Sequence, residues 1–410
     1  MTQEQLKKVF EETDYVHFGG TNAEKKAAET LKAYCEELEV PARLEPFRVQ
    51  MAQIEEAAVI ADGESVPCRG FLCCGSGTAE GELYYMPSLD RVSLAGARDK
   101  IVLLDTQGVR FFQYKDLTEA GVKGILFQFG DAHFPNRDID QRELREAVVG
   151  DGKKVPCAML HVTAAAEMVR SGVKHVKIVI RQREFDAQSH NVVAEIPGEG
   201  EEYITLTAHY DSTALSHGAY DNMSGCAGLL GVMDALRAKK HHYGLRFVFC
   251  GSEERGLLGS HAYVRDHEAD LPHTVLNINL DMIGSLMGRF ISRVSAEDKL
   301  AHYVEYMGAE LAFPVAEART GVYSSDSTPF ADHGVPAISF ARLAGGNAAA
   351  IHCRYDKMDI LSMAQLEKDI AFITEFTRRM ADAACCPVAR EIPESVKKEL
   401  DEYLNRKRKA

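Results

Sequence analysis

The chain has 410 residues, of which 46% are apolar and 26% are charged. This composition excludes a disordered chain, and the length allows more than one globular domain. The formal net charge is −14, and the only basic cluster is the final NRKRKA. The charge therefore argues against nucleic acid or an anionic membrane as a partner.

The sequence carries no visible targeting segment. Its first residues, MTQEQLKKVFEETDY, lack the apolar core of a secretory signal, and no later stretch reaches the ~20 apolar residues of a membrane helix. The ten cysteines form no paired C-x-x-C framework, so we expect reduced thiols. Together these features predict a cytoplasmic protein.

The N-terminal region, residues 1–54, begins with two helical segments. Residues 2–14 and 22–39 have helical periodicity, and Thr21-Asn22 is a capping signal for the second segment. A strand-like stretch follows at residues 42–51. We expect this region to be the first part of the main domain.

Residues 55–183 have a different character from the segments on either side. Several short strand runs are separated by turns, with two helical segments between them and no metal-ligand pattern. The strand runs are residues 82–85, 100–104, 124–127 and 156–160, and the helical segments are 112–120 and 163–171. This pattern predicts a smaller α/β domain inserted into the main one.

The main domain resumes at about residue 184 and continues to residue 410. A strand at residues 189–198 precedes an alternation of strands and apolar helices, including helices at 223–238 and 363–384. Such alternation predicts an α/β fold with a mostly parallel sheet covered by helices on both faces. The tail has Val396, Leu400 and Leu404 on one helical face, which fits docking on the body or on a second copy in a homo-oligomer.

Three strand-like runs of the main domain end in residues that can bind a metal. His209 follows residues 204–207, Glu253 and Glu254 follow residues 246–250, and Asp281 follows residues 275–280. A buried strand fixes the position of the side chains at its end, so a rigid sheet would aim these ligands at one place.

Asp221 and His352 extend this set. Asp221 stands just before the apolar stretch that begins near Met223, a position that also fits a helix N-cap. His352 follows the strand-like residues 337–341 and an Ala/Gly-rich loop. Two histidines and three carboxylates suit a pair of Zn²⁺ ions with one bridging carboxylate. Such a pair polarises a carbonyl and acidifies water.

Five segments of this region resemble peptidase family M28, whose known members are mainly co-catalytic zinc aminopeptidases. They occur in the family's order and span most of residues 185–360. The segments are HYDS from His209, YDNMSG from Tyr220, GSEERGLLGS from Gly251, NLDMIG from Asn279, and the H-x-x-x-D of His352 to Asp356.

The resemblance implies five metal ligands for two zinc ions: Asp221 as the bridge, His209 and Asp281 in one site, and Glu254 and His352 in the other. It also implies that Glu253 is the general base, which agrees with the chemistry of two adjacent glutamates, one ligating and one accepting a proton. Asp211 resembles the family's carboxylate that orients the ligating imidazole.

Two positions depart from the family's pattern. Ile351 stands where the family often has a tyrosine that stabilises the oxyanion, and Ser327 stands where the S-D-H-x-P-F segment usually has a histidine. Tyr323 and Tyr355 are candidates to replace the missing tyrosine.

The inserted residues 55–183 resemble the protease-associated (PA) domain found in some M28 peptidases. The similar segments are DKIVLLD, LTEAGVKGILF and VPCAMLHVTAAAEMV. The resemblance implies a lid that shapes access to the site, with an inert packing module as the alternative.

We therefore predict a metallopeptidase that removes N-terminal amino acids from peptide substrates. Three alternatives share the site or the fold. A carboxypeptidase or dipeptidase would hold the substrate carboxylate with a cation, for which Arg342 and Arg354 are close in sequence. A glutaminyl cyclase-like transferase would bind one metal, and a non-catalytic peptidase-like binding protein would have lost ligands.

Overall fold

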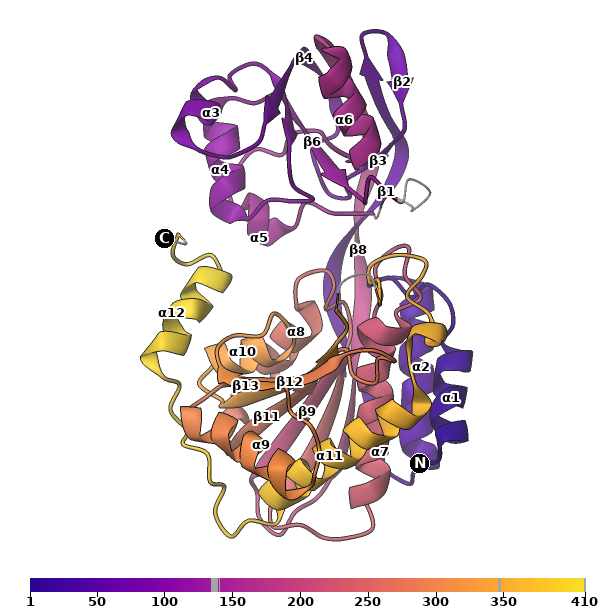
Figure 1. Ribbon diagram of the computed structural model, residues 1–410, viewed down its shortest axis with the longest axis vertical. Coiled ribbons are helices and arrows are strands. Elements are labelled where there is room, and N and C mark those ends of the chain that lie inside the picture. The colour runs from indigo at the N-terminus through magenta and orange to yellow at the C-terminus, as the bar shows by residue number, and fades with distance from the viewer. Residues whose placement is uncertain (134–138, 140, 346–347, 409–410) are drawn as a thin grey trace. The chain divides into compact units, whose positions relative to one another are not determined.

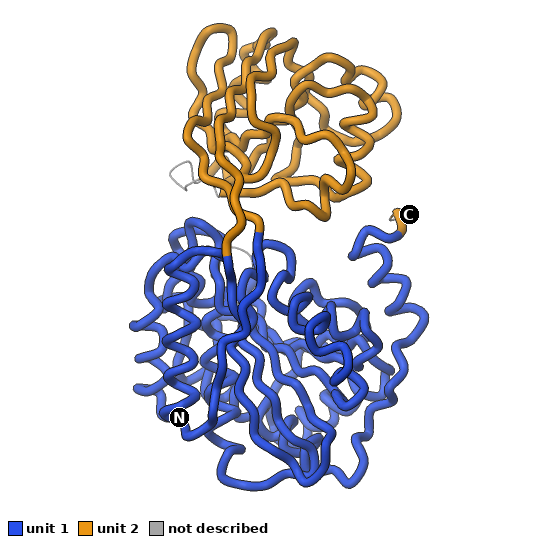
Figure 2. The backbone as a smooth tube through the Cα atoms, turned by 180° about the vertical axis from the view of Figure 1, so that it is seen from behind, with its two compact units in different colours: residues 1–49, 188–406 blue, residues 50–187, 407–410 orange. Residues whose placement is uncertain are grey.

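The computed structural model describes residues 1–133, 139, 141–345 and 348–408. The chain forms two compact units (Figure 2). Unit 1 comprises residues 1–49 and 188–406, and unit 2 comprises residues 50–187 and 407–410. Two long strands, β1 (Ala42–Ala61) and β8 (His175–Ile196), each contain residues of both units.

Unit 1 is built around a mostly parallel sheet, as predicted (Figure 1). Its strands lie in the order β13-β12-β14-β11-β9-β10-β8. Its other strands are β9 (Tyr203–His209), β10 (Gly244–Cys250), β11 (Thr274–Leu280), β12 (Arg289–Ser295), β13 (Glu317–Thr320) and β14 (Ala337–Leu343). β9 pairs in parallel with β10 and β11, and β11 pairs in parallel with β14. β8 and β12 run antiparallel to their neighbours β10 and β14.

The central strands are apolar on both faces because helices cover both. Every residue of β9, β10 and β11 is buried except Tyr203 at the start of β9, which is partly exposed. Along β10, Phe247 and Phe249 join the larger core cluster, whereas Val248 and Cys250 join a second cluster on the opposite face. This alternation is the two-residue period of a strand between two layers.

Helices on the larger core side are α1 (Gln3–Glu12), α2 (Asn22–Glu37), α7 (Ser224–Leu236), α9 (Asp298–Glu310) and α11 (Met363–Ala381). The other face carries α8 (Leu258–Asp266) and α10 (Ser327–Asp332). Thr21 is the N-cap of α2, since its side chain accepts a hydrogen bond from Glu24 N at 3.2 Å.

The C-terminal helix α12 (Glu394–Tyr403) docks on unit 1. Val396 and Leu400 are buried in one apolar cluster with Ala331 and Ala337. Two of the three residues on the apolar face predicted for this tail are therefore covered within the chain, whereas Leu404 is partly exposed. Short one-turn helices η1 (Ala219–Met223), η2 (Leu271–His273) and η3 (Met358–Ile360) complete the unit.

The strands of unit 2 pair in the order β8-β4-β5-β6-β7-β3. Its strands include β2 (Glu64–Val66), β3 (Cys68–Gly70), β4 (Gly77–Met86), β5 (Ile101–Leu104), β6 (Gly124–Phe129) and β7 (Cys157–His161), and β4 to β7 are parallel. Its helices are α3 (Arg91–Ala95), α4 (Phe111–Ala120), α5 (Glu146–Val149) and α6 (Val162–Ser171). A separate apolar core fills this unit.

Both strands that link the units are longer than the sequence predicts. β1 continues ten residues beyond the expected end at residue 51, and β8 begins at His175 rather than near residue 189. The exposed residues 183–186, three of which are charged, interrupt the apolar pattern of β8 and hide its continuity. Within the described residues, no helix has the length and apolar character needed to cross a membrane.

Candidate metal centre

The carboxyl ends of the parallel strands meet at one edge of the unit 1 sheet. His209, the last residue of β9, is paired with Cys250, the last residue of β10. Glu253 and Glu254 follow β10 in the next loop, and Asp281 directly follows β11. The sheet therefore brings these residues to the same edge.

Asp221 reaches this edge from a π-helical turn, η1, that precedes α7. The N-cap position of α7 belongs to Met223, so the alternative of Asp221 as a helix cap is wrong. Asp356 holds the turn, since its carboxylate accepts hydrogen bonds from Tyr220 N at 2.7 Å and Asp221 N at 3.1 Å. Asn222 links the turn to β11 by donating to Leu280 O at 2.9 Å.

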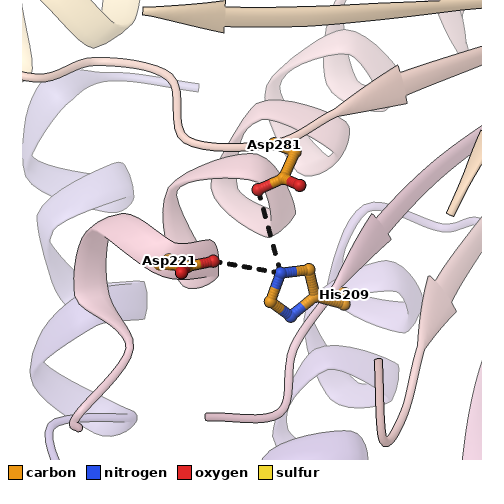
Figure 3. A group of neighbouring side chains, drawn as sticks. All are labelled: His209, Asp221 and Asp281. Atoms are coloured by element: carbon orange, nitrogen blue, oxygen red, sulfur yellow. Dashed lines mark ion pairs between the residues drawn. The ribbon is translucent and has the colours of Figure 1, made fainter. Parts of the chain in front are cut away.

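His209, Asp221 and Asp281 form the first group of possible ligands (Figure 3). His209 Nε2 lies 3.2 Å from Asp221 Oδ1 and 3.8 Å from Asp281 Oδ1. All three side chains are buried. As Figure 3 shows, both carboxylates point toward the same ring nitrogen.

Asp221, Glu254 and His352 form the second group. His352 Nε2 lies 3.1 Å from Asp221 Oδ2 and 3.0 Å from Glu254 Oε1. The two carboxylate oxygens of Asp221 thus face different groups, Oδ1 toward His209 and Oδ2 toward His352.

Asp211 supports the first group and the glutamate loop together. It is fully buried, and its carboxylate accepts hydrogen bonds from Glu253 N at 2.8 Å and Glu254 N at 3.1 Å. Its Oδ1 lies 3.5 Å from His209 Nδ1, and its backbone oxygen lies 3.2 Å from the same nitrogen. A contact on Nδ1 leaves Nε2 to face the ligand groups.

Glu253 lies beside the two groups without belonging to either. Its Oε2 is 3.8 Å from His209 Nε2. Burial raises the pKa of Glu253 well above its usual value, and the nearby Glu254 carboxylate adds to this effect while His209 opposes it. Burial and the Glu254 carboxylate thus both favour the protonated form of Glu253, and a cation bound beside it would favour the carboxylate.

The pKa values of the two histidines are raised as well, although burial acts on them in the opposite sense. Burial alone would lower the pKa of His209, but Glu253 and the other carboxylates around it raise it well above its usual value. The pKa of His352 is raised in the same way by Glu254 and Asp221, against the effect of burial. The site thus attracts positive charge strongly.

The donor set fits a pair of zinc ions. Ligand atoms bound at about 2.0–2.2 Å in a tetrahedron lie roughly 3.3–3.6 Å apart, and within each group all ligand atoms lie within 4.8 Å of one another. Asp281 Oδ1 is buried and has no hydrogen-bond partner among the described residues. Buried carboxylates gathered this closely need cations to offset their repulsion and desolvation.

The two positions that depart from the family's pattern, and the two tyrosines considered as replacements, have different surroundings in the structure. Tyr323 is half-buried, and its pKa is raised well above its usual value by burial and by Asp281 and Asp221. Tyr355 is 47% exposed. Ile351 packs against the larger core cluster, and the buried Ser327 Oγ lies 2.8 Å from Ser339 Oγ. The carboxylates of Asp281 and Asp221 thus act on the Tyr323 hydroxyl.

Asp356 and Asn222 support the Asp221 turn, a role that the motifs containing them do not predict. The spacing H-x-x-x-D from His352 marks Asp356 in the sequence. Its two hydrogen bonds, however, join it to Tyr220 and Asp221, which precede it by 136 and 135 positions. A linear pattern does not reveal such contacts.

Comparison with known proteins finds a family match over part of the chain. Residues 191–377 match the model of peptidase family M28. The chain contains an M28 peptidase domain. This match includes all five candidate ligands, together with Asp211 and Glu253.

Curated relatives of the M28 domain are aminopeptidases by name. The chain is 33% identical over 143 residues to Aminopeptidase YwaD of Bacillus subtilis, a stretch covering 33% of this chain and 31% of that protein. It is 37% identical over 207 residues to Leucine aminopeptidase 2 of Trichophyton rubrum, covering 47% and 38%. The matches thus span about a third of each curated relative's length.

A solved structure has a similar fold across the whole chain. A zinc aminopeptidase from Bacillus subtilis superposes with a TM-score of 0.76 at 20% identity, covering 96% of this chain and 98% of that one. At this identity the likeness shows the fold, which agrees with the parallel sheet and helices of unit 1.

Proposed function

We propose that this protein is a zinc aminopeptidase that removes N-terminal residues from peptides. The observation that carries the proposal is the placement of Asp221, whose two oxygens lie 3.2 Å from His209 Nε2 and 3.1 Å from His352 Nε2. A carboxylate shared by two ligand groups is typical of a two-metal hydrolytic site. The curated relatives named as aminopeptidases support the same reaction.

Two zinc ions would be held by the two groups: His209 and Asp281 for one, Glu254 and His352 for the other, and Asp221 for both. When bound, zinc supplies Lewis acidity that lowers the pKa of water and polarises the peptide carbonyl.

Glu253 would act as the general base. It lies at the site but belongs to neither ligand group, so its carboxylate is left to accept a proton from the attacking water. It would then return that proton to the amine that leaves. Asp211 accepts hydrogen bonds from Glu253 N and Glu254 N, and it would thereby fix the positions of the base and of the adjacent ligand.

Tyr323 would replace the tyrosine that the family often has at the position of Ile351. The raised pKa keeps its hydroxyl protonated, so it can donate a hydrogen bond to the oxygen that gains charge in the transition state.

The carboxypeptidase alternative loses its first candidate cation. Arg342 is 6% exposed, and its Nη2 lies 2.7 Å from Asp369 Oδ1 in a buried ion pair. It also donates to Gly288 O at 3.0 Å. A guanidinium that is paired in this way cannot hold a substrate carboxylate.

The two ligand groups also favour a site with two metal ions over the single metal of a glutaminyl cyclase-like transferase.

Three further points stay proposals: the division into domains at residues 55 and 183 with a PA-like lid, the cytoplasmic location, and the oligomeric state. Each can be tested separately from the reaction.

The test of the reaction is a peptide pool in which each peptide is present with a free and with an acetylated N-terminus. Zinc-loaded and chelator-stripped protein are compared by mass spectrometry. We expect loss of single N-terminal residues from free peptides only, and only with zinc. Cleavage that ignores acetylation would favour a carboxypeptidase, and no cleavage with zinc bound would favour a binding protein.

A further inference from the structure

A carboxylate far from the ligands in sequence reaches the loop that carries the proposed base. Glu24 lies in the first turn of α2 and is completely buried. Its Oε1 accepts hydrogen bonds from Ser189 Oγ at 2.7 Å and Ser252 Oγ at 2.9 Å. Its Oε2 accepts one from Gly20 N at 2.7 Å. Three donors compensate a charge that would otherwise be costly to bury.

Ser252 is the residue immediately before Glu253, and its backbone is in the left-handed region at φ 53°. A serine rarely adopts this conformation unless its surroundings hold it there. Its fully buried hydroxyl is held by Glu24. The conformation that aims Glu253 is thus tied to α2.

The N-terminal turn packs against this loop with no space between them. A Cβ atom added at Gly19 would lie 2.6 Å from Ser252 Oγ, and one added at Gly251 would lie 2.9 Å from Glu24 Oε1. The same N-terminal segment exchanges hydrogen bonds with Ser212, through His17 N to Ser212 Oγ at 3.1 Å and Ser212 N to His17 O at 3.2 Å. It therefore contacts residues next to both Asp211 and Glu253.

We infer that Glu24 is a positioning residue that fixes the Ser252–Glu253 segment from one side while Asp211 fixes it from the other. Asp211 accepts from the backbone of Glu253 and Glu254, whereas Glu24 holds the Ser252 side chain. The catalytic part of this inference rests on the proposed function, because it requires Glu253 to be the base.

The test uses the zinc-loaded full chain with Glu24→Gln. The amide keeps the size of the side chain but replaces one acceptor oxygen by a donor, so it cannot accept all three hydrogen bonds. Glu29→Gln is the matched control, because Glu29 is exposed on the same helix. Ser252→Ala removes the contact from the other side and guards against a Glu24 variant that fails to fold.

Hydrogen exchange of the amides of residues 251–257 is the readout that does not depend on activity. We expect Glu24→Gln and Ser252→Ala to lose protection there, with zinc content unchanged and Glu29→Gln equal to wild type. In an active enzyme kcat should fall about 10–100-fold with little change in KM, as expected for a misplaced catalytic group. The double variant should lose no more than the stronger single variant.

Unchanged exchange at residues 251–257 in both variants would overturn the inference, whether or not the protein cleaves peptides. A wild-type protein that binds zinc but cleaves nothing would instead overturn the proposed function, and the exchange data would still decide whether Glu24 holds the loop. A loss of kcat that Glu29→Gln shares would also contradict the inference.

Discussion

Both units contain a run of parallel strands, yet ligand-type residues converge in only one of the two runs. In unit 1, β9, β10 and β11 lead into His209, Glu253 and Asp281, which lie within reach of one another. In unit 2, β5 leads into Asp105 and β7 ends at His161. Among the described residues, neither of these two belongs to a group with metal-ligand spacing.

The difference lies in what surrounds each strand end. Asp105 is exposed and accepts a hydrogen bond from the side chain of Gln128. His161 caps α6, since its Nδ1 accepts from Thr163 N at 3.3 Å. In unit 1, hydrogen bonds hold the turn around Asp221 and the loop of Glu253 in place beside the strand ends. Several buried carboxylates therefore lie close together there. A polar residue after a parallel strand is therefore not sufficient for a metal site. Whether such a site forms depends on the buried residues that hold the polar residue in place.

The largest effect should come from Glu253→Gln. We expect kcat to fall about 10²–10⁴-fold, because the amide cannot take the proton from water. Zinc content, measured by inductively coupled plasma mass spectrometry, should stay at the wild-type value. Turnover near the wild-type value with both metals bound would show that Glu253 is not the general base.

Tyr323→Phe should have the next largest effect. Loss of one donor to the oxyanion costs about 10²–10³-fold in kcat, and KM should change little because the contact forms in the transition state. Tyr355→Phe is the matched control on an exposed tyrosine. Equal effects of the two substitutions would contradict the assignment of the donor.

Asp211→Asn tests the buried support that sets unit 1 apart. Its carboxylate accepts two backbone hydrogen bonds and faces His209 Nδ1. We expect zinc affinity to fall about 10–100-fold, the usual effect of removing a residue that orients a ligand. Competition with a zinc chelator measures the affinity. An unchanged affinity would show that the strand ends alone build the site.

The smallest effect is expected in unit 2. Asp105→Asn and His161→Ala should leave both the zinc content and the zinc affinity at wild-type values, whereas Asp281→Asn in unit 1 should lower both. A loss of zinc in either unit 2 variant would break the contrast between the two units.

Much of the fold could be predicted from the sequence, since the apolar runs that end at His209, Cys250 and Leu280 mark buried strands by composition alone. The candidate ligands could be named because their residue types follow those strands. The sequence left a helix cap open as the alternative for Asp221, because a one-turn π-helix before α7 leaves no periodic signal. Glu24 was missed because its contacts with Ser189 and Ser252 join distant segments.

The most direct test of the central claim is diffraction from crystals of the zinc-loaded protein at the zinc absorption edge. We predict two anomalous peaks per chain, on either side of Asp221, one beside His209 and Asp281 and the other beside Glu254 and His352. A single peak, or peaks away from Asp221, would contradict the two-metal site at the edge of the unit 1 sheet.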